Sequence, residues 1–189
     1  MKTESSFLYF LRISLTLLVI TTVVAALLAG VNAVTDPEIT KKTAEKTRQA
    51  VEAVLPGGGE LMDANTYSDP TGLVTAAYKS EAGYAVQVAP SGFGGIIDML
   101  VGIDREGRVL AVSIISHAET PSLGAVAAAD NGAGAAFRGS FIGLSGEIKV
   151  SKDGGQADTI TGATVTSRAV AAGVSAAVEF AAGLDQGGD

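Results

Sequence analysis

An uncharged, apolar stretch occupies the beginning of the chain. Residues 13–35 contain no charged side chain, and a helix of that length can cross a lipid bilayer. Lys2 and Arg12 precede the stretch and Asp36 follows it, so the positive-inside rule predicts residues 1–12 in the cytoplasm and the remainder outside. A cleaved signal peptide is also conceivable, but the apolar run is long for a signal core. We therefore expect a retained transmembrane helix.

A polar segment with helical spacing comes next. Residues 36–59 predict an amphipathic helix and a linker, because Asp36 and Pro37 suit a helix start. Pro56 and the glycines that follow it end the helix. The residues at helical spacing are Ile39, Thr43, Thr47, Val51 and Val54.

Apolar and polar residues then alternate with a period of two, which indicates β-strands. Two pairs of such segments each enclose a short turn that contains a glycine, and this arrangement predicts two β-hairpins. The pairs are residues 73–79 with 84–89 around Gly83, and residues 96–104 with 109–116 around Gly107.

The C-terminal part combines short elements with one long helix. Residues 124–137 predict a weak, glycine-rich helix, and residues 147–152 predict another strand. Residues 164–184 predict a final amphipathic helix, followed by a disordered tail at 185–189. The order of elements predicts one α+β domain over residues 60–184, with mostly antiparallel strands packed against helices.

The composition narrows the possible chemistry. Among 189 residues there is no cysteine, no tryptophan and one histidine, so disulfides, thiolate metal sites and thiol redox reactions are excluded. If this protein transfers electrons, a bound cofactor must carry them. The formal net charge of −7 argues against a nucleic-acid partner, whose phosphates require a basic surface.

The segment TGATVTS, residues 161–167, has the residues for one kind of site. A strand ending near Ile160 would lead there into the final helix, and a helix N-terminus offers unpaired N–H groups to an anion. Gly162 and Ala163 would let a phosphate approach the backbone closely. Hydroxyl groups follow at Thr164, Thr166 and Ser167. The residues alone are compatible with a phosphate-binding helix start or with an ordinary threonine-capped helix.

Two motifs together resemble a known family. Residues 158–164, DTITGAT, match the pattern D-x-x-[ST]-G-A-T recognised by the bacterial flavin transferase that attaches FMN, and they continue into the broader pattern [ST]-G-A-T-x-T. HAETPSLG, residues 117–124, is similar to H-x-E-T-P-G-L-G, and residues 92–117 resemble the segment that precedes it. The chain from residue 13 to 184 resembles RnfG-type and NqrC-type subunits, parts of membrane redox complexes that couple electron transfer to Na⁺ or H⁺ movement.

The resemblance implies a cofactor and its site residues. It implies FMN joined through its phosphate to the side chain of Thr164. The residues that align with what the transferase recognises are Asp158, Thr161, Gly162 and Ala163, and those that align near the phosphate are Thr166 and Ser167. The residues that align with the flavin-lining loop are Glu119, Thr120, Pro121 and Leu123.

Ser122, within that loop, and His117, before it, differ from the other motif residues in what they imply. Ser122 stands where the family usually has glycine, which can serve a positive φ angle or a close backbone approach. His117 with Glu119 suggests a metal pair, but a metal site needs three or four ligands and no others are evident. We expect His117 to be a structural hydrogen-bonding residue and expect no metal site.

The resemblance favours an RnfG-type electron relay that completes no catalytic cycle alone. Its partners would be the other membrane subunits of the Rnf complex, with the flavin transferase needed for maturation. The domain would lie outside the cytoplasm, anchored in the cell membrane by one helix. Chain length favours this interpretation over an NqrC-type subunit of a Na⁺-translocating quinone reductase. The sequence is also compatible with a stand-alone extracellular flavoprotein reductase, or with an anchored binding domain that has a degenerate flavin motif.

Overall fold

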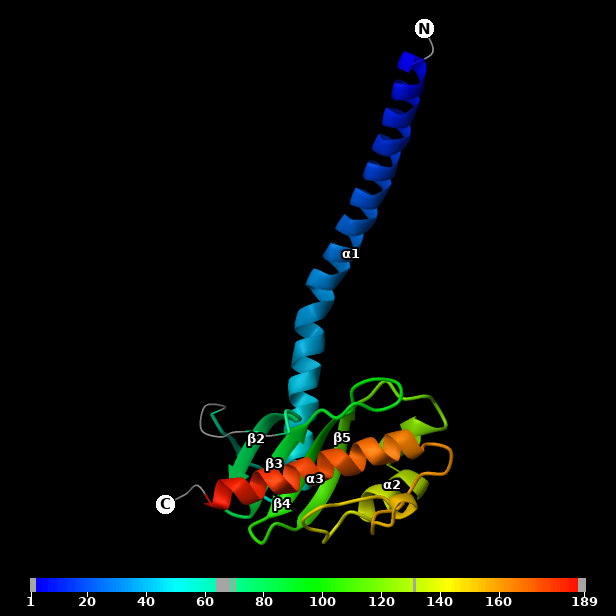
Figure 1. Ribbon diagram of the computed structural model, residues 1–189. Helices are drawn as coiled ribbons and strands as arrows, with labels where there is room; N and C mark the ends of the chain where they lie inside the picture. The colour runs from blue at the N-terminus through cyan, green and yellow to red at the C-terminus, as the bar shows by residue number, and fades with distance from the viewer. Residues whose placement is uncertain (1–2, 64–68, 70, 131, 187–189) are drawn as a thin grey trace. The chain divides into compact units, whose positions relative to one another are not determined.

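The computed structural model describes residues 3–63, 69, 71–130 and 132–186. The chain divides into two units, Met1–Glu45 and Lys46–Asp189. In chain order the elements are α1 (Thr3–Val54), β1 (Glu60–Leu61), β2 (Val74–Ser80), β3 (Gly83–Val88), β4 (Asp98–Asp104), β5 (Val109–Ser116), the 3₁₀-helix η2 (Gly124–Ala128), α2 (Gly132–Gly139), the 3₁₀-helix η3 (Ser151–Asp153) and α3 (Thr164–Gln186). All the strands belong to the second unit (Figure 1).

The helix α1 runs without a break through Pro37. Proline lacks the N–H that would bond to the carbonyl four residues back, but its fixed φ angle is compatible with a helix. The sequence predicts a new helix start at Asp36, whereas the structure joins the predicted transmembrane and amphipathic helices into one. Large apolar side chains between Leu8 and Val34 are exposed. Within the described ranges, α1 is the one helix long and apolar enough to cross a membrane.

Five antiparallel strands form one sheet in the order β1-β2-β3-β4-β5. Both predicted hairpins are present, β2 with β3 next to Gly83 and β4 with β5 around Gly107. The predicted α+β fold is thereby confirmed. Nothing in the residue pattern indicates β1, a two-residue strand with exposed side chains that pairs with β2.

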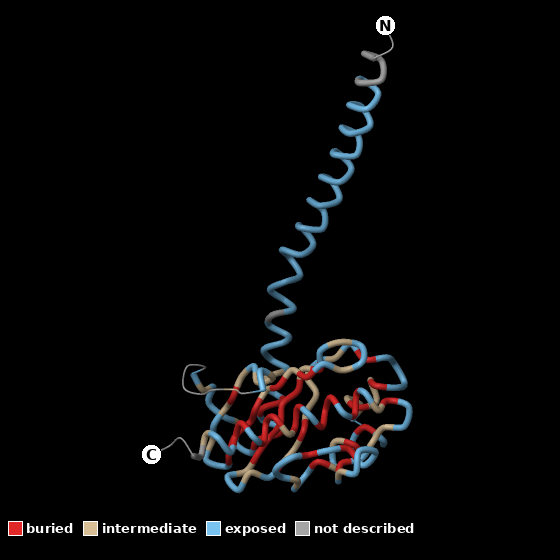
Figure 2. The backbone as a smooth tube through the Cα atoms, viewed as in Figure 1, coloured by how far each residue is buried: buried red, intermediate tan, exposed pale blue. Residues whose placement is uncertain are grey.

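Different segments cover the two faces of the sheet. Side chains alternate along a strand, so the directly paired Val86 and Val101 point to one face while Ala85 points to the other. The helix α3 crosses the first face and contributes Val174 to the larger core (Figure 1). The opposite face packs against buried side chains from the end of α1 and the residue after it, namely Ala50, Val51, Val54 and Leu55. Buried residues are accordingly concentrated in the sheet and α3 (Figure 2).

The prediction of a strand at residues 147–152 is wrong. The structure has only an isolated bridge between Val150 and Ala157, and η3 follows it. The physical reason is that a backbone N–H group of this segment donates to a side chain of α3 and not to a neighbouring strand. Ile148 donates to the hydroxyl of Ser175 on α3 at 2.6 Å, so this segment is tied to a helix instead of to the sheet.

Other differences concern glycine-rich and terminal segments. Residues 124–137, predicted as one weak helix, contribute to two short ones, η2 and α2, because glycine lowers helix stability. Residues 158–160, predicted to end a strand, have no regular secondary structure, although the final helix begins at Thr164 as predicted. Of the predicted disordered tail, residues 185–186 belong to α3, and residues 187–189 lie outside the described residues.

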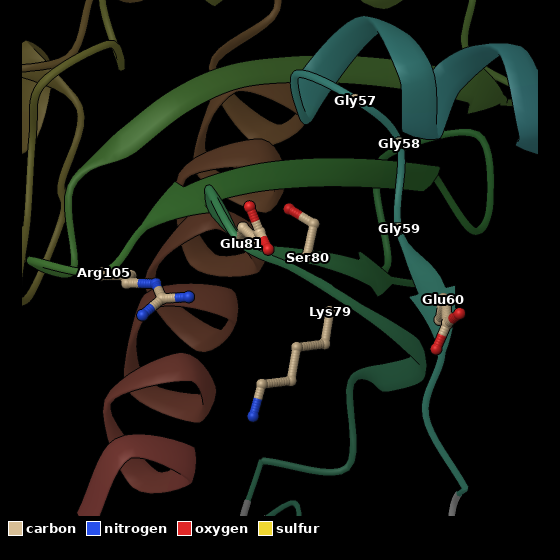
Figure 3. Close-up of a pocket in the computed structure, with 8 residues that line it drawn as sticks. All are labelled: Gly57, Gly58, Gly59, Glu60, Lys79, Ser80, Glu81 and Arg105. Atoms are coloured by element: carbon tan, nitrogen blue, oxygen red, sulfur yellow. The ribbon is translucent and has the colours of Figure 1, made fainter.

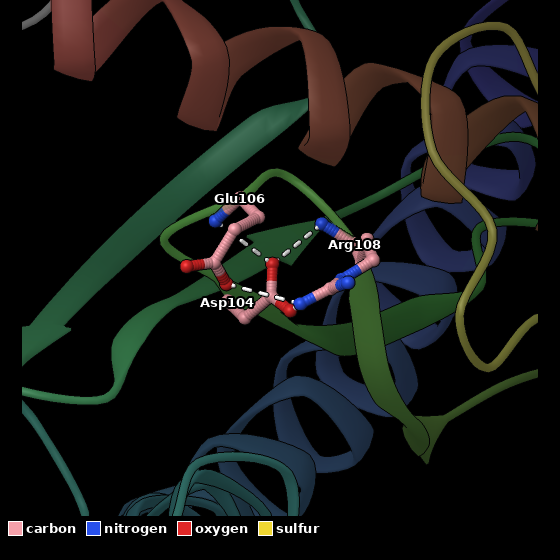
Figure 4. Close-up of polar contacts among 3 residues, drawn as sticks. All are labelled: Asp104, Glu106 and Arg108. Atoms are coloured by element: carbon pink, nitrogen blue, oxygen red, sulfur yellow. Dashed lines mark hydrogen bonds and ion pairs between the residues drawn. The ribbon is translucent and has the colours of Figure 1, made fainter.

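One carboxylate holds the turn between β4 and β5 (Figure 4). Asp104 Oδ1 accepts hydrogen bonds from the N–H groups of Glu106 (3.0 Å) and Arg108 (2.8 Å), and Oδ2 accepts one from Arg108 Nε (2.9 Å). Partial burial raises the pKa of the Asp104 carboxyl, but these hydrogen bonds and the Arg108 charge outweigh it and leave the pKa below its ordinary value. Asp104 therefore stabilises the turn between β4 and β5.

Candidate functional site

The TGATVTS segment forms the turn before α3 and the first turn of that helix. The helix begins at Thr164, directly after a tight turn in which the N–H of Ala163 donates to the carbonyl of Ile160 at 3.0 Å. Thr161 and Gly162 are exposed on this turn, and Ala163 is buried below it. N–H groups in the first turn of an α-helix have no partner within the helix, so this end favours a bound anion.

The hydroxyl groups in this turn divide into buried and accessible ones. Thr166 is 2% exposed and Ser167 is fully buried, whereas Thr164 is only half-buried. Ser167 Oγ donates to the carbonyl of Ala163 (2.9 Å) and accepts the N–H of Ile160 (3.0 Å). Ser167 therefore fastens the turn to the helix, and its hydroxyl group is already used inside the protein.

A buried carboxylate connects three segments that are distant in sequence. Glu119 is 6% exposed, and its Oε2 accepts a hydrogen bond of 2.6 Å from the hydroxyl of Thr166. Its Oε1 accepts the N–H of Gly94 at 2.9 Å. We call these three residues, Gly94, Glu119 and Thr166, the Glu119 clamp. Through the clamp, the loop before β4, the loop after β5 and the start of α3 are held together.

The glycine that ends the HAETPSLG motif is required by this clamp. A Cβ atom at Gly124 would lie 2.3 Å from Glu119 Oε2 and 2.6 Å from Thr166 Oγ1, which are impossible contacts. The backbone N–H of Glu119 donates to Nδ1 of His117 at 3.2 Å, so His117 has the structural hydrogen bond expected of it. In the described part of the chain, no three His, Asp or Glu side chains gather as metal ligands would.

Ser122 has a left-handed backbone conformation, which glycine adopts readily. Its φ angle is +61°, and it is the one residue other than glycine, among those described, with a positive φ. An L side chain in this left-handed region costs about 1 kcal/mol, which glycine would avoid. The loop therefore has a left-handed backbone conformation at the position where the family pattern has glycine.

The two motifs lie against each other at the surface. Gly162 has a φ of +81°, and a Cβ atom placed on it would be 3.2 Å from Cδ2 of Leu123. Leu123 is 45% exposed, and Thr120 and Pro121 are exposed on the same loop. The loop 120–123 and the turn before Thr164 therefore form one continuous, partly apolar surface beside the accessible hydroxyl.

A lysine that the sequence did not indicate contacts that hydroxyl. Nζ of Lys152 donates to Oγ1 of Thr164 at 3.2 Å, across 12 residues of sequence. Lys152 lies on η3, in the segment wrongly predicted as a strand, and only the three-dimensional structure brings it here. Asp158, predicted for recognition by the transferase, has an exposed side chain, and its N–H donates to the hydroxyl of Ser140 at 2.9 Å.

A separate pocket lies at another part of the domain (Figure 3). It has a volume of about 530 Å³ and brings together Lys79 and Arg105 with Glu60 and Glu81, charges of both signs. Its remaining lining residues are Gly57, Gly58, Gly59 and Ser80. None of the motif residues lines this pocket, so it is unrelated to the surface around Thr164.

Known proteins resemble this chain over most of its length. Residues 92–179 match the family described as FMN-binding domain. The chain is 30% identical over 179 residues to the G subunit of an ion-translocating oxidoreductase complex from Methanosarcina acetivorans, and the match covers 89% of this chain and 93% of the relative. A protein of the same description from Cronobacter sakazakii is 35% identical over 188 residues, covering 90% and 89%.

A third relative has a more specific description. The G subunit of a proton-translocating ferredoxin:NAD(+) oxidoreductase complex from Clostridium ljungdahlii is 43% identical over 100 residues, which cover 51% of each chain. The region that matches the FMN-binding domain includes both the HAETPSLG loop and the TGATVTS turn. The sequence similarity and the site geometry thus concern the same part of the molecule.

Proposed function

The chain belongs to the family of G subunits of ion-translocating oxidoreductase complexes, and from that membership we propose that it is an electron-relay subunit carrying covalent FMN on Thr164. In this proposal it completes no catalytic cycle alone and passes electrons between other membrane subunits of its complex. Ion translocation is then a property of the whole assembly.

The observation that carries the proposal is the contact between two family motifs beside the half-buried Thr164. The Leu123 loop lies against the Gly162 turn, and Thr164 follows directly, half-buried, with its hydroxyl contacted by the exposed Lys152. The other two hydroxyl groups of the turn, on Thr166 and Ser167, are buried and hydrogen-bonded within the protein. Among the three hydroxyl groups of the first turn of α3, that of Thr164 is therefore the most available to a modifying enzyme, while the exposed Thr161 precedes the helix.

The residues around Thr164 suit a flavin phosphate. The start of α3 favours an anion, and the Lys152 ammonium group already contacts the hydroxyl that would carry the phosphoester. The exposed, partly apolar loop with Thr120, Pro121 and Leu123 is available to the flavin ring. Bound FMN would supply the ability to accept and donate one or two electrons, which no side chain of this cysteine-free chain provides.

The Glu119 clamp has a supporting part in this proposal. It does not need to contact the cofactor, because both carboxylate oxygens accept hydrogen bonds from the protein. It holds the loop and the first turn of α3 in one arrangement, which fixes the position of the attachment hydroxyl. Exposed residues of the DTITGAT motif, including Asp158 and Thr161, would be read by the flavin transferase.

The attachment is tested by mass. The full-length chain is co-expressed with a flavin transferase, purified in detergent, denatured and examined by intact mass and in-gel flavin fluorescence. We expect a gain of one FMN less one water on the native chain, none on Thr164→Val, and a gain on Thr164→Ser, which keeps a hydroxyl. A native chain that gains nothing, while the transferase modifies a control substrate, would sink the attachment and favour an anchored binding domain.

The proposed topology puts residues 1–12 in the cytoplasm and the FMN-binding domain outside. Because the chain has no cysteine, single cysteines can report on it without background. In intact cells we expect a membrane-impermeant maleimide to label Ser145→Cys, at an exposed position, and to leave Ser5→Cys unlabelled until the membrane is opened. The reverse labelling would place the domain in the cytoplasm.

A further inference from the structure

Thr164, the proposed attachment residue, is contacted by a lysine that has no ion pair with any described residue. Lys152 is exposed, and its Nζ donates to Thr164 Oγ1 at 3.2 Å. Its charged neighbours are paired: Lys149 Nζ lies 2.7 Å from Glu147 Oε1, and Arg168 Nε donates to Asp153 Oδ2 at 2.7 Å. Over the residues that the structure describes, no carboxylate oxygen lies within 4.0 Å of Lys152 Nζ. Its positive charge is therefore available to a ligand.

The backbone of Lys152 is held in place from both sides. The N–H of Lys152 donates to Oγ1 of Thr159 at 3.3 Å, and the N–H of Ser151 donates to the carbonyl of Ala157 at 2.6 Å. Next to it, Asp153 makes two hydrogen bonds with Arg168 on α3. The pKa of Asp153 is lowered chiefly by its hydrogen bond from Arg168, so this connection is ionic at neutral pH. The long side chain is thus attached at a fixed point beside the start of α3.

From these contacts we propose that Lys152 is the phosphate-anchoring residue of the site, pairing with the phosphoryl group that becomes attached to Thr164. This inference rests on the proposed function, since it needs FMN to be joined at Thr164. A phosphodiester carries one negative charge at neutral pH, and a lysine ammonium group is a compact, strongly charged donor to phosphate oxygens. The Thr164 oxygen and the incoming phosphorus would both lie within reach of the same ammonium group.

The chemistry of the attachment step explains why a positive charge is useful beside Thr164. The donor must be a flavin nucleotide whose FMN phosphoryl group is activated as a phosphoric anhydride. The Thr164 oxygen forms a bond to that phosphorus and loses its proton to solvent or to the leaving group. The anhydride P–O bond breaks, and the displaced nucleoside monophosphate leaves with the electron pair. No electron is gained or lost overall, and Lys152 offsets the negative charge that remains on the new phosphodiester.

The test compares three variants at two lysines three positions apart. Purified full-length chain in detergent is incubated with purified transferase and its flavin nucleotide, and intact mass is followed over time. We expect Lys152→Met to slow attachment about tenfold, because one charge-assisted contact to the phosphoryl group is lost. Lys152→Arg should restore most of the rate, and Lys149→Met, the matched loss of one exposed positive charge, should leave it unchanged.

A second measurement separates phosphate binding from recognition by the transferase. Each chain is loaded to completion, and its melting temperature is compared with that of the same chain before loading. Native chain and Lys149→Met should gain the same increment on loading, and Lys152→Met should gain less. Attachment to Lys152→Met at the native rate, or equal slowing by Lys149→Met, would overturn the inference. A native chain that gains no FMN would overturn the attachment itself, and this inference with it.

Discussion

Thr164 and Thr166 are two residues apart in one turn of α3, yet their surroundings are opposite. Thr166 is 2% exposed and donates to a buried carboxylate, whereas Thr164 is half-buried and receives a hydrogen bond from an exposed lysine. Residues two apart on an α-helix are separated by about 200° around its axis, so they cannot serve the same surface. One motif thus supplies a structural threonine on one side of the helix and a chemically available one on the other.

The difference separates the residues that hold the site in place from the residue that is proposed to react. Glu119 and Thr166 are buried and hydrogen-bonded, and their loss should be detected as lost stability. Thr164 contributes little to packing, and its loss should be detected as lost attachment with the fold intact. Urea unfolding of the detergent-solubilised, full-length chain, followed by circular dichroism, tests this division through four sets of variants.

We expect the largest loss of stability at Gly124, where the Glu119 clamp leaves no room for a side chain. In Gly124→Ala the new Cβ atom would overlap Glu119 Oε2 and Thr166 Oγ1, so the clamp must open or the loop must move. We expect the free energy of unfolding to fall by about 3 kcal/mol. The control is Gly139→Ala, where no atom lies near the added methyl group. Equal stability of Gly124→Ala and the native chain would show that the clamp is not tightly packed.

The next effect comes from one hydroxyl group. Thr166→Val keeps the side-chain shape but leaves Glu119 Oε2 buried without its donor. We expect a loss of about 2 kcal/mol, the usual cost of removing one partner of a buried charged group. Thr164→Val is the matched variant two residues away, and it should change stability by less than about 0.5 kcal/mol. If the two variants were equally stable, the division between structural and available threonine would be wrong.

A carboxylate near the surface gives a smaller, pH-dependent effect. Because the folded-state pKa of Asp104 lies below its ordinary value of 3.8, its contribution is fully present above that value and is lost as pH falls through the lowered pKa. Asp104→Asn should cost about 1 kcal/mol at pH 7 and progressively less as the solution becomes acidic. Asp158→Asn, at an exposed carboxylate, is the control. A loss in Asp104→Asn that does not change with pH would contradict the assignment.

The smallest effect should be a gain. Ser122→Gly removes the strain of a side chain at a φ angle of +61° but adds flexibility to the unfolded chain. The two terms nearly offset, so stability should rise by less than about 1 kcal/mol. Ser145→Gly, at an exposed position without positive φ, should not share the gain. A clear loss of stability in Ser122→Gly would mean that the serine side chain has a contact of its own.

The sequence predicts the regular parts of this fold well. Both hairpins and the start of α3 follow from alternation, turn glycines and helix spacing, which are local properties of the chain. At Ser122 the family glycine leaves a positive φ angle and a close backbone approach both open, and the structure has the positive φ. These features depend on residues that are neighbours in sequence.

The features that the sequence does not reveal are contacts between distant segments. The hydrogen bond between Glu119 and Thr166 spans 47 residues, and no local pattern shows that the carboxylate lies under the helix. The segment around Lys152 has the composition of a strand, but its N–H groups bond to Ser175 and to a loop. Lys152 belongs to neither motif, and no sequence pattern points to it, so only the structure reveals its contact with Thr164.

The Glu119 clamp also has a consequence for the order of assembly. Every buried side-chain nitrogen and oxygen in the described residues finds its hydrogen-bond partner within the protein itself. The hydrogen bonds of the buried side chains around the first turn of α3 are therefore all made within the chain, and none of them needs a cofactor atom as partner. For a flavin joined at Thr164, maturation is then a surface reaction on a finished domain. In that case we expect folding of the domain to precede the attachment of FMN, with only the attachment requiring the transferase.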